Sequence, residues 1–407
     1  MVKLLAILTS CALLLECLPV RAFGGPIAYN RPNALINIGG QDLWLADPAG
    51  NNPPRALFQL DLLSGSNLLS ARNPVWSRDG RYLAAVGLIA PTPGTTPIVQ
   101  GTPLFGGGYS IVMFDQSGAW RRVTSLGTAL DDGVYTAFSP DGTRLAYVNP
   151  GGNFAEFYVT NIDGSQRTLV GSWSIVQSEG STGTGMDWSP AADELVIPIS
   201  IPYSISGAVS GALCSLQPQQ LSQLLQSQRL PVPVTALFLA RPMANGLCAA
   251  EQLSFPPSSF NPYVDQSDLA SLFQPIATLA EDGFPVFSHD GTKVAFVRET
   301  KTISWLSPNQ MSLAIRVVDV PCSLKFHSPL CEREVVHATV PNMAVCGLSW
   351  SVEQTKLVFG LGQVYGPDVS SLACNAGLWV VNIDGTDPHA LKMTPADANS
   401  PSWSWGP

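Results

Sequence analysis

Residues 134–148 read V-Y-T-A-F-S-P-D-G-T-R-L-A-Y-V, a stretch that predicts two β-strands joined by a tight turn. The turn is Ser139-Pro140-Asp141-Gly142: proline presets φ, aspartate can bond its own backbone, and glycine accepts the positive φ that closes the turn. One strand ends before the turn, at Phe138. The apolar run 145–148 follows the turn and indicates a second strand that is buried on both faces.

The same pattern recurs along the chain, so the hairpin is one copy of a repeat. Each copy places an aromatic residue and a serine directly before the turn. Two copies depart from the pattern, because Ala191-Ala192 and Glu353-Gln354 replace the Asp-Gly pair. The other copies read P-V-W-S-R-D-G at Trp76, M-D-W-S-P-A-A-D at Trp188, P-V-F-S-H-D-G at Phe287 and L-S-W-S-V-E-Q at Trp350, and a last fragment, P-S-W-S-W, spans 401–405.

The number of strands predicts the architecture. Each complete unit holds four strands, the innermost of which ends at the aromatic residue, and five units are complete. The sixth unit is split: residues 34–38, 42–46 and 55–60 supply three strands, and residues 401–405 supply the innermost one. A four-stranded blade buries both faces only by stacking against neighbours in a ring.

We therefore predict an all-β, six-bladed β-propeller of four-stranded blades, whose last blade is closed by N-terminal strands plus the C-terminal strand. A pair of β-sandwiches is the alternative, and it does not explain a repeat of about 50 residues.

The units resemble the TolB-type β-propeller repeat, in which P-x-W-S-P-D-G-x-x-L-A-F is followed by I-Y-V-x-D-x-D-G-S-x-x-R-x-L. Residues 137–148 together with 157–170 match this pattern nearly throughout, and residues 378–391 match its second half. The resemblance covers essentially all of the chain after its first residues. It implies a stand-alone propeller, since the chain leaves no room for the additional α/β domain that TolB carries.

Composition agrees with a protein built from many short strands. The 407 residues are 45% hydrophobic and only 13% charged, and they include 36 glycines and 34 prolines, which suit many turns. The net charge is −9. An acidic surface has the wrong sign to attract nucleic acid or an anionic bilayer through the overall field, so neither is an expected partner.

The first 22 residues predict a cleaved secretory signal peptide. Lys3 supplies the positive start, residues 4–15 are apolar, and Val20-Arg21-Ala22 gives a cleavage site after Ala22. Residues 23–407 are then a single propeller domain, expected to be periplasmic or secreted and monomeric. A lipoprotein is the alternative, but Cys11 lies too early for it. No later run reaches the roughly 18 apolar residues of a spanning helix, so we expect no membrane span.

Six cysteines remain after the signal peptide, an even number that predicts disulfides in an exported chain. Proximity in sequence favours Cys322 with Cys331, then Cys346 with Cys374, and last Cys214 with Cys248. For the last pair, buried free thiols are the alternative. No Cys-x-x-Cys spacing points to a metal.

The sequence offers few groups for chemistry, so we predict no catalytic, cofactor-binding or metal-binding residue. No Gly-x-Ser-x-Gly elbow occurs, and the four histidines are scattered. The aspartates of the repeat are expected to serve the turns. Asp131 and Asp132 precede an innermost strand and could face the channel mouth, with a solvated loop as the alternative. The turn aspartates are Asp79, Asp141, Asp290 and Asp384.

The long insertions are expected to carry the function. Connections between the second and third strands, and from the fourth strand to the next blade, lie on one face of a propeller. The insertions at 87–108, 200–234, 256–281, 299–312 and 361–376 are all of these kinds. They carry the aromatic anchors Phe105, Phe273, Trp305 and Tyr365. Arg78, in a short turn on the other face, is expected to be unimportant for binding.

Two classes of function remain open. The first is an interaction module that binds an envelope or extracellular protein, peptide or glycan. The alternative is a propeller-fold enzyme, of the lyase or hydrolase type, acting on a sugar or lactone at the channel mouth. An apolar or aromatic rim favours the first, and three or more convergent His, Asp or Glu residues favour the second.

Overall fold

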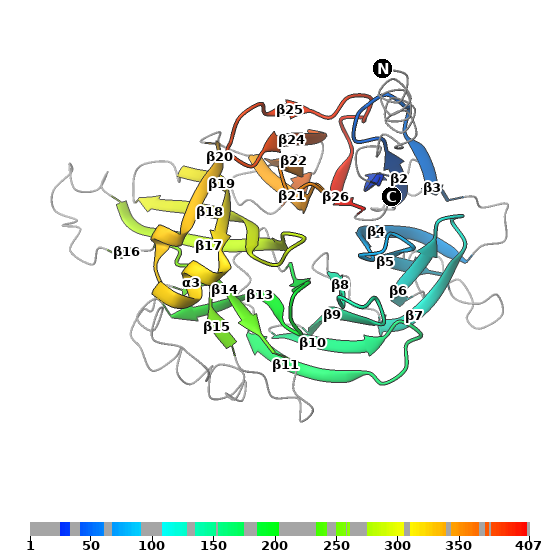
Figure 1. Ribbon diagram of the computed structural model, residues 1–407, viewed down its shortest axis with the longest axis horizontal. Helices are drawn as coiled ribbons and strands as arrows, with labels where there is room; N and C mark the ends of the chain where they lie inside the picture. The colour runs from blue at the N-terminus through cyan, green and yellow to red at the C-terminus, as the bar shows by residue number, and fades with distance from the viewer. Residues whose placement is uncertain are drawn as a thin grey trace, which may run out of the picture.

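The computed structural model describes residues 25–32, 41–60, 67–90, 108–127, 135–151, 154–174, 185–202, 233–241, 250–257, 259–260, 275–304, 310–338, 343–365, 371–373 and 376–404. The strands are arranged radially around a central axis, as a β-propeller (Figure 1). Within the described ranges, no helix is both long and apolar enough to cross a membrane.

The two ends of the chain meet in one sheet. Its order is β26 (Asn399–Trp403), β1 (Ile27–Pro32), β2 (Gln41–Ala46) and β3 (Arg55–Phe58). Trp403 pairs with Ile27. The predicted closure of this blade is therefore present. Its second strand is β1, whereas residues 34–38, which we predicted in that place, lie outside the described ranges.

Three further sheets are separate blades. The first two are four-stranded, and the third carries an additional short strand, β23, beside β22. They contain β4 (Leu68–Trp76), β5 (Tyr82–Ile89), β6 (Gly108–Asp115) and β7 (Trp120–Gly127); β8 (Thr136–Phe138), β9 (Arg144–Gly151), β10 (Phe154–Asn161) and β11 (Thr168–Ser174); and β21 (Met343–Trp350), β22 (Lys356–Tyr365), β23 (Ser371–Ala373), β24 (Leu378–Asn382) and β25 (His389–Ala390).

The remaining strands form one nine-stranded sheet. A single parallel pair, Thr235 with Glu281, joins the run that begins at β12 to the run that begins at β17. Within the described residues, four sheets are thus separate blades, and the prediction of six separate blades is wrong because this contact merges the rest. The strands are β12 (Asp187–Trp188), β13 (Leu195–Pro202), β14 (Pro233–Ala240), β15 (Ala250–Gln252), β16 (Ser259–Phe260), β17 (Pro275–Phe287), β18 (Lys293–Ser304), β19 (Gln310–Asp319) and β20 (Glu332–Ala338).

Several strands of this sheet, and β22 in its own blade, are longer than predicted. The expected insertions at 256–281, 299–312 and 361–376 overlap β17, β18, β19 and β22. The reason is that the paired strands continue beyond the apolar run that the sequence marks: Glu299 to Thr302 still pair with β19.

The repeated turns have the predicted chemistry. The N–H of Gly142 donates to the Ser139 carbonyl at 2.9 Å, and Gly142 has φ +69°. The Ser139 hydroxyl lies 2.6 Å from the Asp141 carboxylate, so serine and aspartate brace the turn together. In the fifth copy Gln354 takes the left-handed position, at φ +58°, and the turn still closes.

The core lies between neighbouring blades. One cluster packs Val148 and Phe157 against Trp188 and Phe238, which belong to a different sheet. The aromatic residue that ends each innermost strand is buried in every case, which explains why the repeat keeps it. These residues are Trp76, Phe138, Trp188, Phe287, Trp350 and Trp403.

A disulfide links Cys322 to Cys331, as predicted. It closes the connection between β19 and β20, which contains helix α3 (Val320–Phe326) and the 3-10 turn η4 (Pro329–Cys331). Cys346 is buried and also disulfide-bonded. Its predicted partner Cys374 lies outside the described residues, as do Cys214 and Cys248, so these two pairings remain predictions.

Candidate functional site

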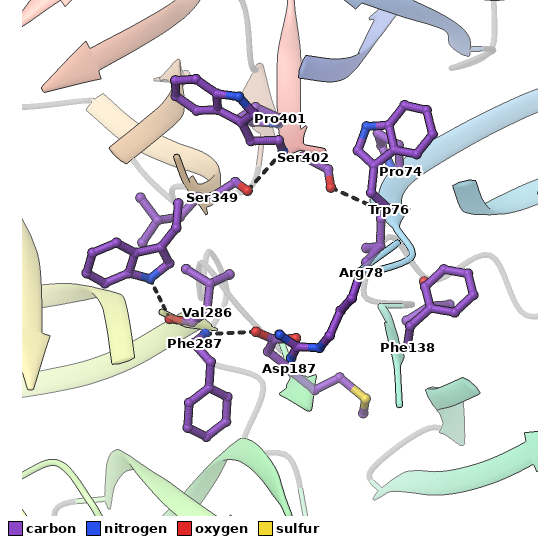
Figure 2. A pocket seen from close by; sticks show the side chains of 16 residues that line it. Pro74, Trp76, Arg78, Phe138, Asp187, Val286, Phe287, Ser349, Pro401 and Ser402 are labelled. Atoms are coloured by element: carbon purple, nitrogen blue, oxygen red, sulfur yellow. Dashed lines mark hydrogen bonds between the residues drawn. The ribbon is translucent and has the colours of Figure 1, made fainter. Parts of the chain in front are cut away.

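The innermost strands surround a cavity on the central axis, the channel. Its volume is about 90 Å³. Strands from all around the ring contribute to its wall (Figure 2). The lining residues are Pro74, Val75, Trp76, Arg78, Thr136, Phe138, Met186, Asp187, Val286, Phe287, Leu348, Ser349, Trp350, Pro401, Ser402 and Trp403.

Polar side chains in the channel wall connect neighbouring innermost strands. The Ser402 hydroxyl accepts a hydrogen bond from the Trp76 main-chain N–H at 3.1 Å. Ser349 and Asp187 act in the same way, and each stands directly before the aromatic residue of its own strand (Figure 2). The Ser349 hydroxyl accepts from the Trp403 N–H, and the Asp187 carboxylate accepts from the Phe287 N–H. The wall is therefore held by side chains that point along the ring.

One end of the channel, which we call the mouth, is mostly apolar. It is the end at which the innermost strands begin. The rings of Tyr135 and Phe284 meet edge to face there, with centroids 5.6 Å apart. The mouth is lined by Asn73, Pro74, Val75, Tyr135, Thr136, Gly185, Met186, Phe284, Pro285, Val286, Gly347, Leu348, Ser400 and Pro401.

The backbone at the mouth is built from repeated β-bulges. Four strands lose their pairing register there, and each places a left-handed residue three positions before its aromatic residue. These residues are Asn73, Phe284, Gly347 and Ser400, with φ of +53°, +50°, +95° and +47°. Only one of the four is glycine, and a bulky residue such as phenylalanine rarely adopts a positive φ.

Arg78, after β4, and Asp187, in β12, bring charge to the channel. The Arg78 side chain extends toward Asp187 (Figure 2). Its guanidinium donates a hydrogen bond to the Trp188 carbonyl. Burial lowers the pKa of Arg78, while the nearby Asp187 charge opposes that shift. Burial likewise raises the pKa of Asp187, against the attraction of Arg78 and the N–H donors of Phe287 and Trp188.

Thr136 adds an uncharged polar group to the channel wall. Its side chain is 2% exposed and lines both the channel and the mouth. Its hydroxyl has no hydrogen-bond partner among the described residues. A hydroxyl both donates and accepts, so this group can bind a ligand of either polarity.

The structure tests few of the predicted binding residues. Phe105, Phe273, Trp305, Asp131 and Asp132 lie outside the described ranges. Tyr365 was predicted in a loop, but it lies at the end of β22, where it pairs with Ser371 of β23.

The turn aspartates serve the turns, as predicted. A hydrogen bond from the Ser139 hydroxyl lowers the pKa of Asp141, and one from the Thr386 hydroxyl lowers the pKa of Asp384. Within the part of the chain that the structure describes, no group of three or more His, Cys, Asp or Glu side chains could hold a metal ion.

Sequence reasoning missed Arg78 and Asp187. Arg78 was taken as a short-turn residue without a role, yet its side chain reaches into the channel. A signal existed in the repeat: the position before the aromatic residue holds Val75, Ala137, Asp187, Val286, Ser349 and Ser402. Asp187 is the one carboxylate in that set, so comparing the copies position by position would have marked it.

Blades of radially arranged strands around a channel with an open, apolar mouth define a β-propeller with a potential binding channel. No protein-family model and no curated protein matches the chain by sequence. Among solved structures, TolB from Acinetobacter baumannii is similar at a TM-score of 0.52 and 16% identity, over 94% of this chain and 67% of that one. The protein is thus a TolB-like β-propeller in fold.

A second similar structure is the periplasmic gluconolactonase PpgL of Pseudomonas aeruginosa. It has a TM-score of 0.40 and 13% identity, over 91% of this chain and 97% of that one. At such identities the likeness concerns the fold, and function has to be argued from the channel.

Proposed function

We propose that this chain is an exported interaction module that binds a protein, peptide or glycan of the cell envelope or the extracellular space at the channel mouth. The observation that carries the proposal is the ring of β-bulges with left-handed residues around an apolar opening. Left-handed backbone at a non-glycine residue costs about 1–3 kcal/mol, and such residues cluster at functional sites.

The bulges also aim side chains at the opening. Bulges next to binding sites redirect side chains that a regular strand would point elsewhere. At Phe284 the bulge brings an aromatic ring to the mouth, where it meets Tyr135. Partly exposed aromatic rings in a rigid frame are suitable anchors for a partner, because little side-chain entropy is lost when they bind.

The insertions at the mouth face extend this surface in the proposal. Phe105, Phe273 and Trp305 belong to them, as does Tyr365 at the end of β22. Asp131 and Asp132 precede the innermost strand β8 and complete the proposed surface. Once a partner has been captured from envelope extract, Trp305→Ala and Phe284→Ala should each weaken its binding at least tenfold. Gln166→Ala, in a short turn on the opposite face, is the control. Equal loss in the control variant, or none in the mouth variants, contradicts the proposal.

Under the same proposal, residues 1–22 are a signal peptide that is removed on export. The Cys322–Cys331 disulfide supports this, because such bonds persist in oxidising compartments. Intact-mass analysis of periplasmic protein should give a chain that starts at Phe23 and has no alkylatable thiol before reduction. A chain that keeps residues 1–22 contradicts export with cleavage.

An enzyme acting on a sugar or lactone is the second candidate, and Asp187 is the observation that favours it. A carboxyl group whose pKa is raised by burial suits a general acid, and the neighbouring Arg78 could stabilise developing negative charge. Assay of lactones and uronate-containing oligosaccharides distinguishes the two functions. Turnover that Asp187→Asn abolishes supports the enzyme, and absence of turnover with a bound partner supports the interaction module.

We also propose that the nine-stranded sheet acts as two blades, which gives the ring six. Its two antiparallel runs meet in one residue pair, and β12 and β17 both line the channel as innermost strands do. In native-state hydrogen exchange, the amides of β13–β14 and of β18–β19 should then open with different free energies. A single shared opening energy argues against two units.

A further inference from the structure

We propose that the disulfide-closed segment 320–331 docks this protein on a lipid surface that contains anionic headgroups. In this proposal the side chains of Phe326 and Leu330 enter the lipid, and the Lys325 ammonium meets the headgroups. The inference does not depend on which ligand the mouth binds. It assigns a role to a segment that takes no part in the channel.

Two large apolar side chains of this segment lie in solvent. Leu330 is 93% exposed and Phe326 is 61% exposed. Within the part of the chain that the structure describes, the other large hydrophobic side chains in solvent are Met393 and Leu169, at 55% and 43%. Single exposed apolar residues are common on protein surfaces. Two of them inside one short closed segment form a local apolar surface that burial in lipid would stabilise.

The remainder of the segment is fixed to the protein. The Cys322–Cys331 disulfide closes it, and the Ser323 hydroxyl donates to the Leu253 carbonyl at 2.6 Å. Cys322 and Leu324 pack against the core cluster that includes Leu237 and Phe296. One side of the segment is therefore anchored, and the other side presents its apolar residues to solvent. A surface that is already ordered loses little conformational freedom when it binds.

The charge of the segment suits an anionic surface, although the net charge of the whole chain is −9. Residues 320–331 include Lys325 and no acidic residue. Both flanking acids already have partners: Asp319 accepts a main-chain N–H of α3, and the Glu332 side chain is fully buried and bonded to Arg298. Physiological salt screens exposed charges beyond about 8 Å, so the lysine governs the attraction at the segment itself.

A cation beside an apolar ring matches the composition of a bilayer interface. The Lys325 Nζ atom lies 5.0 Å from the centre of the Phe326 ring. At a bilayer surface, apolar side chains enter the boundary between headgroups and acyl chains, while the ammonium of a lysine stays at the level of the headgroups. The segment thus offers both interactions that hold a peripheral protein on lipid.

The position of the segment leaves the mouth free. The Val320 N–H donates to the Thr292 carbonyl at 2.9 Å, so α3 begins beside the short turn that follows Phe287. Strand β17 passes the mouth at Phe284 before it reaches this turn. We therefore expect the protein on a membrane to keep the mouth open to a partner.

Vesicle flotation tests the inference with the mature chain and two lipid compositions. One vesicle contains phosphatidylcholine alone, and the other contains phosphatidylcholine and phosphatidylglycerol at about three to one. The amount of floated protein at increasing lipid concentration gives a partition coefficient. We expect the wild type to partition severalfold more strongly onto the mixed vesicles, because one lysine near an anionic surface contributes about fivefold.

Variants then assign the partitioning to the segment. Phe326→Ser and Leu330→Ser should each lower the partition coefficient about tenfold on the mixed vesicles. Lys325→Gln should lower it severalfold on the mixed vesicles and leave it unchanged on phosphatidylcholine. Met393→Ser is the matched control, because its side chain is also exposed but lies outside the segment. The thermal unfolding midpoint of each variant checks the fold, and either serine variant carries the test if the other does not fold.

Three results would overturn the inference. The first is a wild type that floats with neither vesicle, or equally with both. The second is a partition coefficient that Phe326→Ser and Leu330→Ser leave unchanged, or that Met393→Ser lowers as much as they do. The third is a wild type that binds no vesicle while the two serine variants weaken its binding to a captured protein, which would make the segment a protein-binding surface.

Discussion

The carboxylate of Asp187 accepts a hydrogen bond from the main-chain N–H of Phe287 at 2.8 Å, although 100 residues separate the two in sequence. This bond joins the first strands of the two runs in the nine-stranded sheet at the channel wall. It also places an ionisable group where burial opposes its charge, so the stability of the protein should depend on pH at this site.

The first prediction concerns the sign of that dependence. The pKa of Asp187 is raised above its ordinary value of 3.8, so the folded state retains the proton over a range in which the unfolded state loses it. The stability of the wild type relative to Asp187→Asn should therefore fall as pH rises from about 4 through the raised pKa. Urea denaturation of both proteins at a series of pH values measures it.

Asp141→Asn is the matched control, with the opposite sign. The Ser139 hydroxyl and further hydrogen bonds lower the pKa of Asp141, so its contribution is present above the ordinary pKa and is lost as pH falls through the lowered value. If the stability difference from the wild type changes with pH in the same direction for both variants, the raised pKa of Asp187 is contradicted.

The second prediction concerns ring closure by the C-terminal strand. Ser402→Ala removes the acceptor of the Trp76 N–H in a buried wall, and an unsatisfied buried donor costs about 1–3 kcal/mol of unfolding free energy. Ser117→Ala, in an exposed turn, should change stability by less than about 0.5 kcal/mol. Equal denaturation midpoints for the two variants would show that the closing strand does not depend on this bond.

The third prediction concerns the bulges at the mouth. Gly347 has φ +95°, and a Cβ atom there would lie 3.0 Å from the Ser400 Cα atom of the closing strand. Gly347→Ala should cost about 1–3 kcal/mol, through backbone strain and this close approach. Gly142→Ala has a positive φ but open space around it, so the difference between the two variants isolates the steric part. Thermal unfolding measures the loss of stability in both variants. Identical losses would show that the close approach to Ser400 does not lower the stability of Gly347→Ala.

The fourth prediction concerns the buried ion network of the nine-stranded sheet. Arg298 is 6% exposed and donates to both oxygens of Asp282 and of Glu332, whose side chains are fully buried. Arg298→Met leaves both carboxylates without their main counter-charge, and we expect a loss of about 3–5 kcal/mol.

Arg81→Met provides the surface comparison for this network. Its partner Asp79 and its own side chain are largely in solvent, so the loss should stay below about 1 kcal/mol. A loss of similar size in both variants, seen as equal shifts of the urea midpoint, would contradict the structural importance of the buried network.

The sequence by itself determined the repeat, the turns and the closure of the ring. The reason is that these features depend on neighbours within a few residues, or on a pattern that recurs. Ser139, Asp141 and Gly142 close their turn through contacts two to five residues apart, so the tetrapeptide carries its own structure. The aromatic residue before each turn marked the innermost strand, including β26 at the end of the chain.

The tertiary structure alone decided the channel and the merged sheet. The left-handed conformation of Phe284 has no signal in the sequence, because it arises where the backbone of β17 lies against Gly185. Arg78 and Asp187 are 109 residues apart, and only ring closure brings them to one cavity. The single Thr235–Glu281 pair that joins two runs of strands likewise depends on how neighbouring blades pack, which no local pattern encodes.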